Sequence, residues 1–294
     1  MGLLAAEECL AQSYFDASDK PPIPVLVSVP PNRPGFDTTQ GAELAGQLIA
    51  GMPCQGDLER SRFLATGQHG GIALLQEAMT LIADGQASVC LVGGVDSYDS
   101  PFLDWLDLHH RLIADDTAHG MIPGEGAAFV LVASEQFVAS QGIIPTTVLH
   151  GATQGEEPVT WNTGKPGAGQ GLSDALVPLL KDANRVADVT YCDHNGETWR
   201  SDEWTVAYLR TGANHGSPLD LRHPADCWGD LGAASGAMLV ALAHRDLSYA
   251  DQDDPQTALV FCASDMTPIV PPHILKRLGH TERTLHYDLF YDRK

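Results

Sequence analysis

The sequence predicts a layered α/β fold, and three observations support this prediction. Helical and strand-like segments alternate along the 294 residues, as they do in proteins built from helices packed on sheets. The runs 88–92 and 127–133 show no alternation of polar and apolar residues, which is typical of strands covered on both faces. Because 44% of the residues are hydrophobic, a chain of this length can bury a substantial core.

The first part of the chain contains strands and amphipathic helices in turn. Its helices are expected at 1–12, 41–52 and 72–83, and its strands at 25–29, 62–65, 88–92 and 127–133. In the third helix, Leu74, Ala78 and Leu81 recur at the spacing that directs side chains to one helical face. A glycine-containing turn joins the second strand to this helix.

The second part repeats the alternation. Strands are expected at 146–150, 188–192 and 258–262, and helices at 171–184, 201–210 and 232–243. Segments rich in Gly, Pro, Asp or Asn are expected as surface loops at 16–22, 151–171 and 248–256. The chain is therefore expected to form two similar halves, 1–134 and 135–294, each of ordinary domain size.

Composition excludes several classes of function. With 38 acidic and 17 basic residues the net charge is −21, which repels nucleic acid phosphates and anionic membrane surfaces. Apolar runs fall far short of the roughly 20 residues that span a bilayer, and the short apolar start lacks the basic flank of a signal peptide. Six cysteines without a CxxC pair indicate buried, reduced thiols. We therefore expect a cytoplasmic protein, and leave open whether Met1 is the natural start.

The first half contains two glycine-rich motifs. The turn Thr66-Gly67-Gln68-His69-Gly70-Gly71 is followed by a helix and by a strand that ends in Gly93-Gly94, and Pro123-Gly124-Glu125-Gly126 comes later. These motifs resemble the β-ketoacyl synthase family. In that family, a turn bearing the active cysteine lies 25 positions before such a glycine pair. The same separation from Gly93 falls on Gln68, so the resemblance puts glutamine at the cysteine position.

The second half carries two more motifs that resemble this family. His194 and Asp202 fit the family's first histidine motif. The segment 228–236 fits its second, with Asp230 in place of the other catalytic histidine and Ala225 in place of the lysine before it. The glycine-rich loop expected near the end is replaced by 262–268.

The resemblance implies a thiolase-like fold, a layered α/β/α/β/α sandwich of two similar halves. The usual first strand and a long insertion are absent, because the chain begins in a segment that resembles the family's first helix. No cofactor and no metal are implied. The resemblance also implies dimerisation through the strand 88–91 and the adjoining helix, which would cover an exposed sheet edge.

The chemistry implied by the resemblance depends on a cysteine thioester and two histidines that stabilise an enolate. Gln68 carries no usable nucleophile. Family members with glutamine here either decarboxylate a malonyl thioester or serve as inactive subunits beside an active synthase. The decarboxylating kind keeps both histidines, whereas this chain keeps only His194. An ionised Asp230 would repel the developing enolate, so the losses favour an inactive protein.

Other polar residues have structural explanations. His69 could act as a base, but a histidine in a helix-opening turn is more often a cap or a solvent contact. His109 and His110 are not a metal pair, because adjacent residues do not share a helix face. The segment 164–171 lacks the Gly-Lys-Ser/Thr ending of a phosphate-binding loop. In the family, Glu125 and Asp202 are structural, and we expect Trp199, Trp204 and Trp228 to fill the space of an acyl chain.

Two functions follow as hypotheses. The first is a catalytically inactive ketosynthase-like partner, adaptor or scaffold subunit that forms a homodimer, or a heterodimer with a ketosynthase-like protein. The alternative is an enzyme: a malonyl-thioester decarboxylase, an acyl-thioester-binding member of the family, or an unrelated hydrolase using Gln68, His69 and His194. Contact with an acyl carrier protein is possible but disfavoured, because carrier and chain are both acidic.

Overall fold

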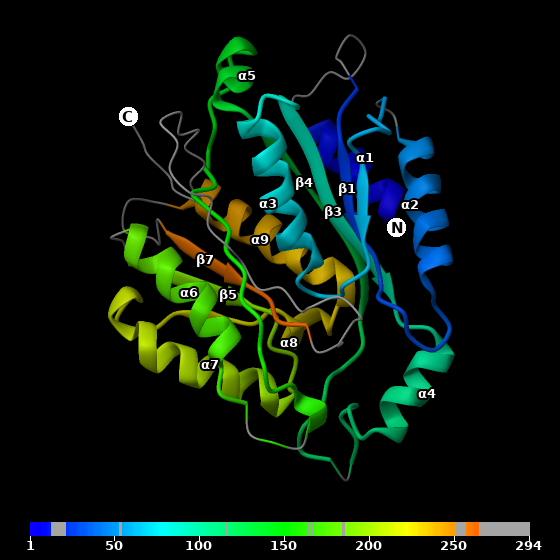
Figure 1. The fold of residues 1–294 in the computed structure, drawn as a ribbon, viewed down its shortest axis with the longest axis vertical. Helices are drawn as coiled ribbons and strands as arrows, with labels where there is room; N and C mark the ends of the chain where they lie inside the picture. Colours follow the sequence, from blue (N-terminus) through cyan, green and yellow to red (C-terminus); the bar gives the residue numbers. More distant parts are fainter. Residues whose placement is uncertain are drawn as a thin grey trace.

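Helices and sheets form five layers in the computed structural model (Figure 1). The structure describes residues 1–12, 22–52, 55–115, 117–163, 165, 167–183, 186–250 and 257–264. From one side to the other, the layers are two helices, a four-stranded sheet, two central helices, a three-stranded sheet and two outer helices. The layered α/β/α/β/α sandwich expected from the sequence is confirmed.

The first sheet has the strand order β2-β1-β3-β4. Its strands are β1 (Val25–Ser28), β2 (Arg62–Leu64), β3 (Val89–Ser97) and β4 (Glu125–Ala133). β1 runs parallel to β2 and β3, and β3 pairs with β4 in the antiparallel direction. β1 pairs directly with β3, opposing Val27 to Gly93. Among the described residues, β1 and β3 are therefore neighbours at the centre of this sheet.

The second sheet repeats this arrangement with three parallel strands in the order β6-β5-β7. They are β5 (Val189–Cys192), β6 (Leu221–Arg222) and β7 (Ala258–Phe261). In each sheet the first strand is flanked by the second on one side and by the third on the other. This shared strand order makes the two halves similar.

In the described part of the chain, six long helices cover the sheets, and six shorter helical segments connect them. The long ones are α1 (Gly2–Gln12), α2 (Thr38–Gly51), α3 (Gly70–Ala83), α6 (Gln170–Ala183), α7 (Thr198–Thr211) and α9 (Ser235–Tyr249). The shorter ones are α4 (Ser100–Leu108), α5 (Glu135–Ser140), η1 (Trp161–Thr163), η2 (Gly212–Asn214), α8 (Ala225–Trp228) and η3 (Gly232–Ala234).

Side-chain alternation in β1 separates the two apolar cores. Val25 and Val27 pack in the cluster that includes α1 and α2, whereas Leu26 points into the cluster that includes α3 and α9. Successive strand residues point to opposite faces, so a strand buried on both sides reads as a continuous apolar run. Burial on both faces explains why this sheet shows no polar alternation in the sequence.

Glycine lets α3 and α9 approach closely where their N-termini meet. A Cβ atom on Gly71 would lie 2.7 Å from the backbone nitrogen of Ala237, and one on Gly236 would lie 2.9 Å from the carbonyl oxygen of Gln68. The Gly236 N–H instead donates to that carbonyl at 3.1 Å. These glycines bring the turn at Gln68 against the start of the second helix.

The sequence located most elements, but several predictions were wrong. Segment 146–150 forms no strand: β5 and β7 pair directly, and Val148 and Leu149 pack on the core without joining a ladder. Helix α7 begins at Thr198, three residues before the predicted start, and α4 and α5 were not predicted. Parts of the predicted loops, of the helix predicted at 171–184 and of the replaced loop at 262–268 cannot be compared, because they lie outside the described residues. The segments concerned are 13–21, 53–54, 184–185, 251–256 and 265–268.

The predicted dimer strand is also corrected. Residues 88–91 cannot provide an open edge, because β3 is paired on one side by β1 and on the other by β4. The first sheet instead ends at β2 and β4.

Among the described cysteines, Cys90, Cys192 and Cys262 are buried as expected, but Cys227 is exposed. All five described cysteines are free thiols. None of the helices described is long and apolar enough to cross a membrane.

Candidate functional site

Gln68 lies in the turn between β2 and α3, two residues before the helix begins. Gly67 adopts a φ of 80°, a conformation that favours glycine, and its carbonyl accepts from the Gly70 N–H at 3.0 Å. The turn therefore directs the Gln68 side chain inward, where it is only 8% exposed.

Asp230 is held by backbone contacts on both sides. Its N–H donates to the carbonyl of Ile122 at 2.7 Å, and its carbonyl accepts from the Gly124 N–H at 2.8 Å. Its carboxylate accepts from the Gly232 N–H at 2.7 Å, which places it at the N-terminus of η3 and of the α9 helix that follows. Asp230 is thereby fixed at the positive end of a helical segment, where a negative charge is stabilised.

The structure brings Gln68 and Asp230 together. The Gln68 side-chain nitrogen lies 3.4 and 3.3 Å from the two carboxylate oxygens of Asp230. Two further donors reach the same carboxylate: the Tyr98 hydroxyl at 2.8 Å and the Asn195 amide at 2.5 Å. Burial and the nearby Asp230 charge raise the pKa of Tyr98 well above its ordinary value, so the phenol remains a donor. The carboxylate is 3% exposed and has accepted four different donor groups.

Three buried ion pairs surround this cluster. Each joins one arginine to one carboxylate: Arg111 to Glu197 at 2.5 Å, Arg200 to Asp193 at 2.6 Å and Arg33 to Asp96 at 2.7 Å. Asn195 links the cluster to the first pair, because its amide also donates to Glu197 at 3.2 Å. These three buried guanidinium groups therefore pair with carboxylates of the same chain, and they are not available to bind a ligand.

An aromatic ring lies against each of these three arginines, and for Arg200 it is the ring of Trp199. The guanidinium of Arg111 lies 4.6 Å from the ring centre of Trp161, and that of Arg33 lies 4.5 Å from the ring centre of Phe102. Such stacking fixes the planar guanidinium and suits a buried arginine better than a lysine. These contacts add ring packing to the buried ion pairs near Asp230.

His194 does not join Gln68 and Asp230. Its Nε2 atom is buried and has no hydrogen-bond partner among the described residues, and its ring lies 6.0 Å from Phe261 and 6.5 Å from His223. Burial, followed by the charges of Arg200 and His223, lowers the pKa of His194 to about 4 despite a backbone hydrogen bond with Arg200. The ring is therefore neutral at pH 7.

The remaining candidate residues have other surroundings. His69 is buried, which corrects the expectation of a solvent contact, and its side chain does not cap α3. Glu125 accepts from the Ser97 hydroxyl at 3.1 Å across the antiparallel pair β3-β4, and Asp202 is exposed on α7. Neither approaches the Asp230 carboxylate through a hydrogen bond, so a structural role fits both.

The three tryptophans do not form one cluster. Trp204 is buried and stacks on Phe261 with ring centres 4.9 Å apart, whereas the ring of Trp199 lies 4.3 Å from the guanidinium of Arg200. Trp228 remains 37% exposed. These contacts differ from one tryptophan to the next, and the expectation that the three fill the space of an acyl chain stays a prediction.

Sequence reasoning missed several residues of the site. Asn195 and Glu197 carried a signal, because they follow β5 within the His194 motif and Gly196 forms a turn with a φ of 101°. Tyr98 lies just beyond the glycine pair of β3. Arg111 carried no such signal, since it comes from the segment after α4 and reaches Glu197 only in the folded chain.

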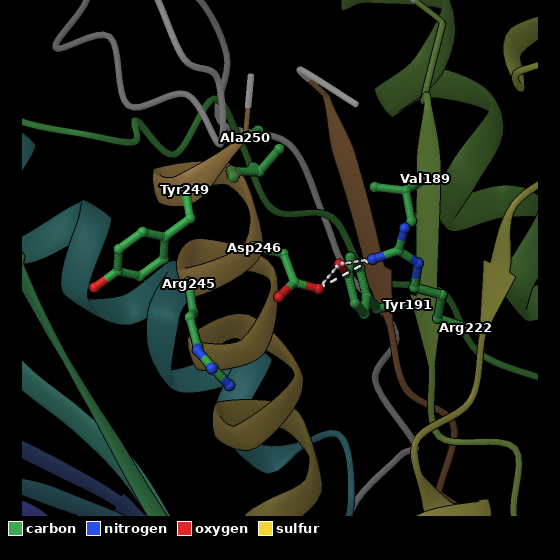
Figure 2. A pocket seen from close by; sticks show the side chains of 8 residues that line it. Val189, Tyr191, Arg222, Arg245, Asp246, Tyr249 and Ala250 are labelled. Carbon is green, nitrogen blue, oxygen red and sulfur yellow. Dashed lines mark hydrogen bonds and ion pairs between the residues drawn. The ribbon is translucent and has the colours of Figure 1, made fainter. Parts of the chain in front are cut away.

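A cavity of about 410 Å³ lies at the other end of α9 (Figure 2). The polar side chains that line it include those of Tyr191, Asp246 and Arg222. The Tyr191 hydroxyl donates a hydrogen bond to the Asp246 carboxylate at 2.6 Å. The 15 residues of α9 separate this cavity from Asp230 by roughly 20 Å along the helix. None of the site residues described above lines it.

The chemistry available near Gln68 is limited. The side chains that meet there are amides, a phenol and a carboxylate whose lone pairs are already used. Burial raises the pKa of Cys90 and of Cys192 to about 12, so these thiols are poor nucleophiles at neutral pH. Across the described part of the chain, no group of three His, Cys, Asp or Glu side chains is arranged to hold a metal ion.

Comparison with known proteins identifies the fold. No family model and no curated protein matches the sequence. Among solved structures, the oxazolomycin ketosynthase domain KS8 of Streptomyces albus JA3453 matches 99% of this chain with 83% of its own, at 18% identity and a TM-score of 0.68. The chain has the thiolase-like fold of ketosynthases.

Other proteins with the ketosynthase fold match similarly. A type II polyketide synthase acyl-carrier protein in complex with its hexaketide-bound ketosynthase matches 92% of this chain and 79% of that one, at 19% identity and a TM-score of 0.64. The ishigamide ketosynthase/chain length factor matches 94% and 79%, at 18% identity and a TM-score of 0.61. A ketosynthase from module 6 of the bacillaene synthase of Bacillus subtilis 168 matches 96% of this chain and 58% of that one, at 13% identity and a TM-score of 0.68.

Proposed function

We propose that this chain is a catalytically inactive ketosynthase-like protein that works through protein-protein contacts, as a partner, adaptor or scaffold subunit. The observation that carries the proposal is the hydrogen bonding between Gln68 and Asp230. Gln68 and Asp230 stand at the positions that resemble the family's cysteine and second histidine. Their side chains are hydrogen-bonded to each other, and neither offers a free reactive group.

Condensation is disfavoured by the absence of a nucleophile. An amide cannot form a thioester, and its nitrogen here donates to a carboxylate. The five described thiols cannot readily replace it: three are deeply buried, Cys9 is half-buried on α1, and Cys227 is exposed on α8.

Decarboxylation is disfavoured by charge. A malonyl thioester that loses carbon dioxide leaves an enolate, whose oxygen needs hydrogen-bond donors. The donors nearest Gln68 already serve the Asp230 carboxylate, which would also repel the enolate. His194, the remaining histidine, makes no hydrogen bond through Nε2 to any described residue.

Protein contact is the function that the fold leaves open. The ishigamide relative pairs a ketosynthase with a chain length factor, which supports a second ketosynthase-like chain as the partner of this one. The chain has only 17 basic residues, and among the described ones Arg33, Arg111 and Arg200 are buried in ion pairs, so few positive charges are left for the surface. An acidic carrier protein is therefore the less favoured partner.

The test is direct incubation of the purified chain with malonyl and acetyl thioesters. We expect no release of carbon dioxide and no acyl transfer above a heat-denatured control. Release that disappears in His194→Ala but persists in His119→Ala would overturn the proposal in favour of a decarboxylase. His119 is a suitable control because it is exposed in the loop before β4.

A further inference from the structure

Asp230 is surrounded by donors in the way that a protein surrounds a bound anion. Four groups converge on its two oxygens: the amides of Gln68 and Asn195, the hydroxyl of Tyr98 and the N–H of Gly232. They come from four separate segments, namely the turn before α3, the end of β3, the loop after β5 and η3. A carboxylate offers about four lone-pair positions, so this set of donors matches it in number.

The donors are neutral, and the charge is stabilised by dipoles. No ion pair involves Asp230 among the described residues, because the nearby arginines pair with Asp96, Glu197 and Asp193. The helical run from Gly232 through α9 points its N-terminus at the carboxylate, and α3 begins two residues after Gln68. Convergent N–H groups and helix N-termini are the usual means of holding an anion without a cation.

Glycine at position 232 is required for this arrangement. Gly232 has a φ of 52°, and a Cβ atom there would collide with the carboxylate of Asp96. The N–H groups of Gly232 and Ala233 can consequently serve two different carboxylates, those of Asp230 and Asp96. Two carboxylates, those of Asp230 and Asp96, are therefore held by neighbouring backbone N–H groups at the N-terminus of η3.

We propose that the chain contains a carboxylate-binding site that is occupied by its own Asp230. The four donors form the site, and the side chain of Asp230 acts as an internal ligand that excludes external carboxylates. This inference rests on the proposed function and deepens it. It gives two reasons for inactivity: Asp230 fills the site from within, and Gln68 replaces a nucleophile.

The site is tested by emptying it. Asp230→Ala removes the carboxylate and leaves room for formate or acetate, whereas Asp230→Asn fills the same space without charge. We expect about 100 mM formate or acetate to raise the melting temperature of Asp230→Ala by about 2–4 °C relative to chloride at equal ionic strength. The wild type and Asp230→Asn should show no such difference, and neutral formamide should not replace formate.

Removal of a donor should weaken the rescue. In the Asp230→Ala background, Asn195→Ala is expected to reduce the affinity for formate by about tenfold, because one of the four bonds is lost. Calorimetric titration measures this affinity. A rise in melting temperature that is the same with chloride, or the same in the wild type, would overturn the proposal.

The variant can be tested even when it does not fold in ordinary buffer. Refolding Asp230→Ala from denaturant in formate and, separately, in chloride should recover folded protein only in formate. Failure in both solutions, where Asp230→Asn refolds, would overturn the internal-ligand proposal. Malonyl-thioester turnover by the wild type would instead overturn the proposed function and leave the anion rescue intact, so the two failures are distinguishable.

Discussion

The side-chain nitrogen of Gln68 lies 3.3 Å from a carboxylate oxygen of Asp230, although 162 positions separate the two residues in the chain. Gln68 follows β2 and Asp230 follows α8, and each precedes a helix of the central layer. The pair therefore joins the N-termini of α3 and of the η3-α9 segment. Because both residues are buried, we expect a substitution at either one to change the chemistry of this contact and not the protein surface.

A cysteine placed at position 68 should be unreactive as long as Asp230 is present. In Gln68→Cys, burial and the adjacent carboxylate disfavour the thiolate. Adding Asp230→Asn removes the charge and should speed alkylation by iodoacetamide by about tenfold or more at pH 7.5. Peptide mass spectrometry follows the reaction, and the exposed Cys227 gives an internal reference in each sample. Equal rates in the two variants, after normalisation to Cys227, would contradict this prediction.

Breaking the Arg111-Glu197 pair should destabilise the fold strongly. Both side chains are buried, and Arg111→Met leaves Glu197 charged without its main partner. We expect a loss of about 3–5 kcal/mol in the free energy of unfolding, measured by urea denaturation. Arg111→Met/Glu197→Gln should recover much of this loss, because the uncompensated charge is removed. A double variant as unstable as Arg111→Met would argue for lost packing on Trp161 instead.

The sequence anticipated the layers and the residues that meet, but not how the site is completed. Gln68 and Asp230 follow from the resemblance of two glycine-containing motifs to the β-ketoacyl synthase family, because the order and spacing of these motifs can be read along the chain. Tyr98 and Arg111 reach the site through long-range packing, which one sequence does not reveal. The strand predicted at 146–150 failed for a similar reason, since strand pairing depends on space in the sheet and β7 already occupies the place beside β5.

Stability should fall in mild acid, partly because of His194. The pKa of this histidine is about 4 in the folded chain, below its ordinary value of 6.5. Below pH 6.5 the unfolded chain binds a proton that the folded chain does not, so the free energy of unfolding declines as the pH falls towards 4. The contribution of His194 to this loss reaches at most about 3 kcal/mol.

The measurement compares urea denaturation of the wild type and His194→Gln between pH 7.5 and 4.5. The variant should lose less stability over this range, whereas His119→Gln, changed at an exposed position, should follow the wild type. Parallel curves for the wild type and His194→Gln would contradict the assignment. Burial also lowers the pKa of His215 and of His244, so some acid sensitivity should persist in the variant.

Dimerisation is predicted to use β2, because the strand inferred from the sequence is internal. The carbonyl of Leu64 accepts from the Val29 N–H at 3.0 Å, so the Leu64 backbone faces β1. Backbone groups of successive strand residues point in opposite directions, and those of Phe63 consequently face the open side of β2. A second chain can pair there and cover the edge. The helix α3, which follows β2, adjoins this edge, and Arg62 reaches its Glu77 at 3.8 Å.

Phe63→Pro tests this edge without removing a hydrogen bond to β1. Proline lacks the N–H that would pair across the dimer, so the variant should sediment as a monomer at concentrations where the wild type is a dimer. Phe63→Ala is the matched control: it loses the same ring but keeps the backbone donor, and should remain dimeric with weaker affinity. Circular dichroism checks that both variants keep the fold. A wild type that is monomeric alone but pairs with an intact ketosynthase through the same edge would favour the heterodimer, whereas dimerisation that survives Phe63→Pro would place the interface elsewhere.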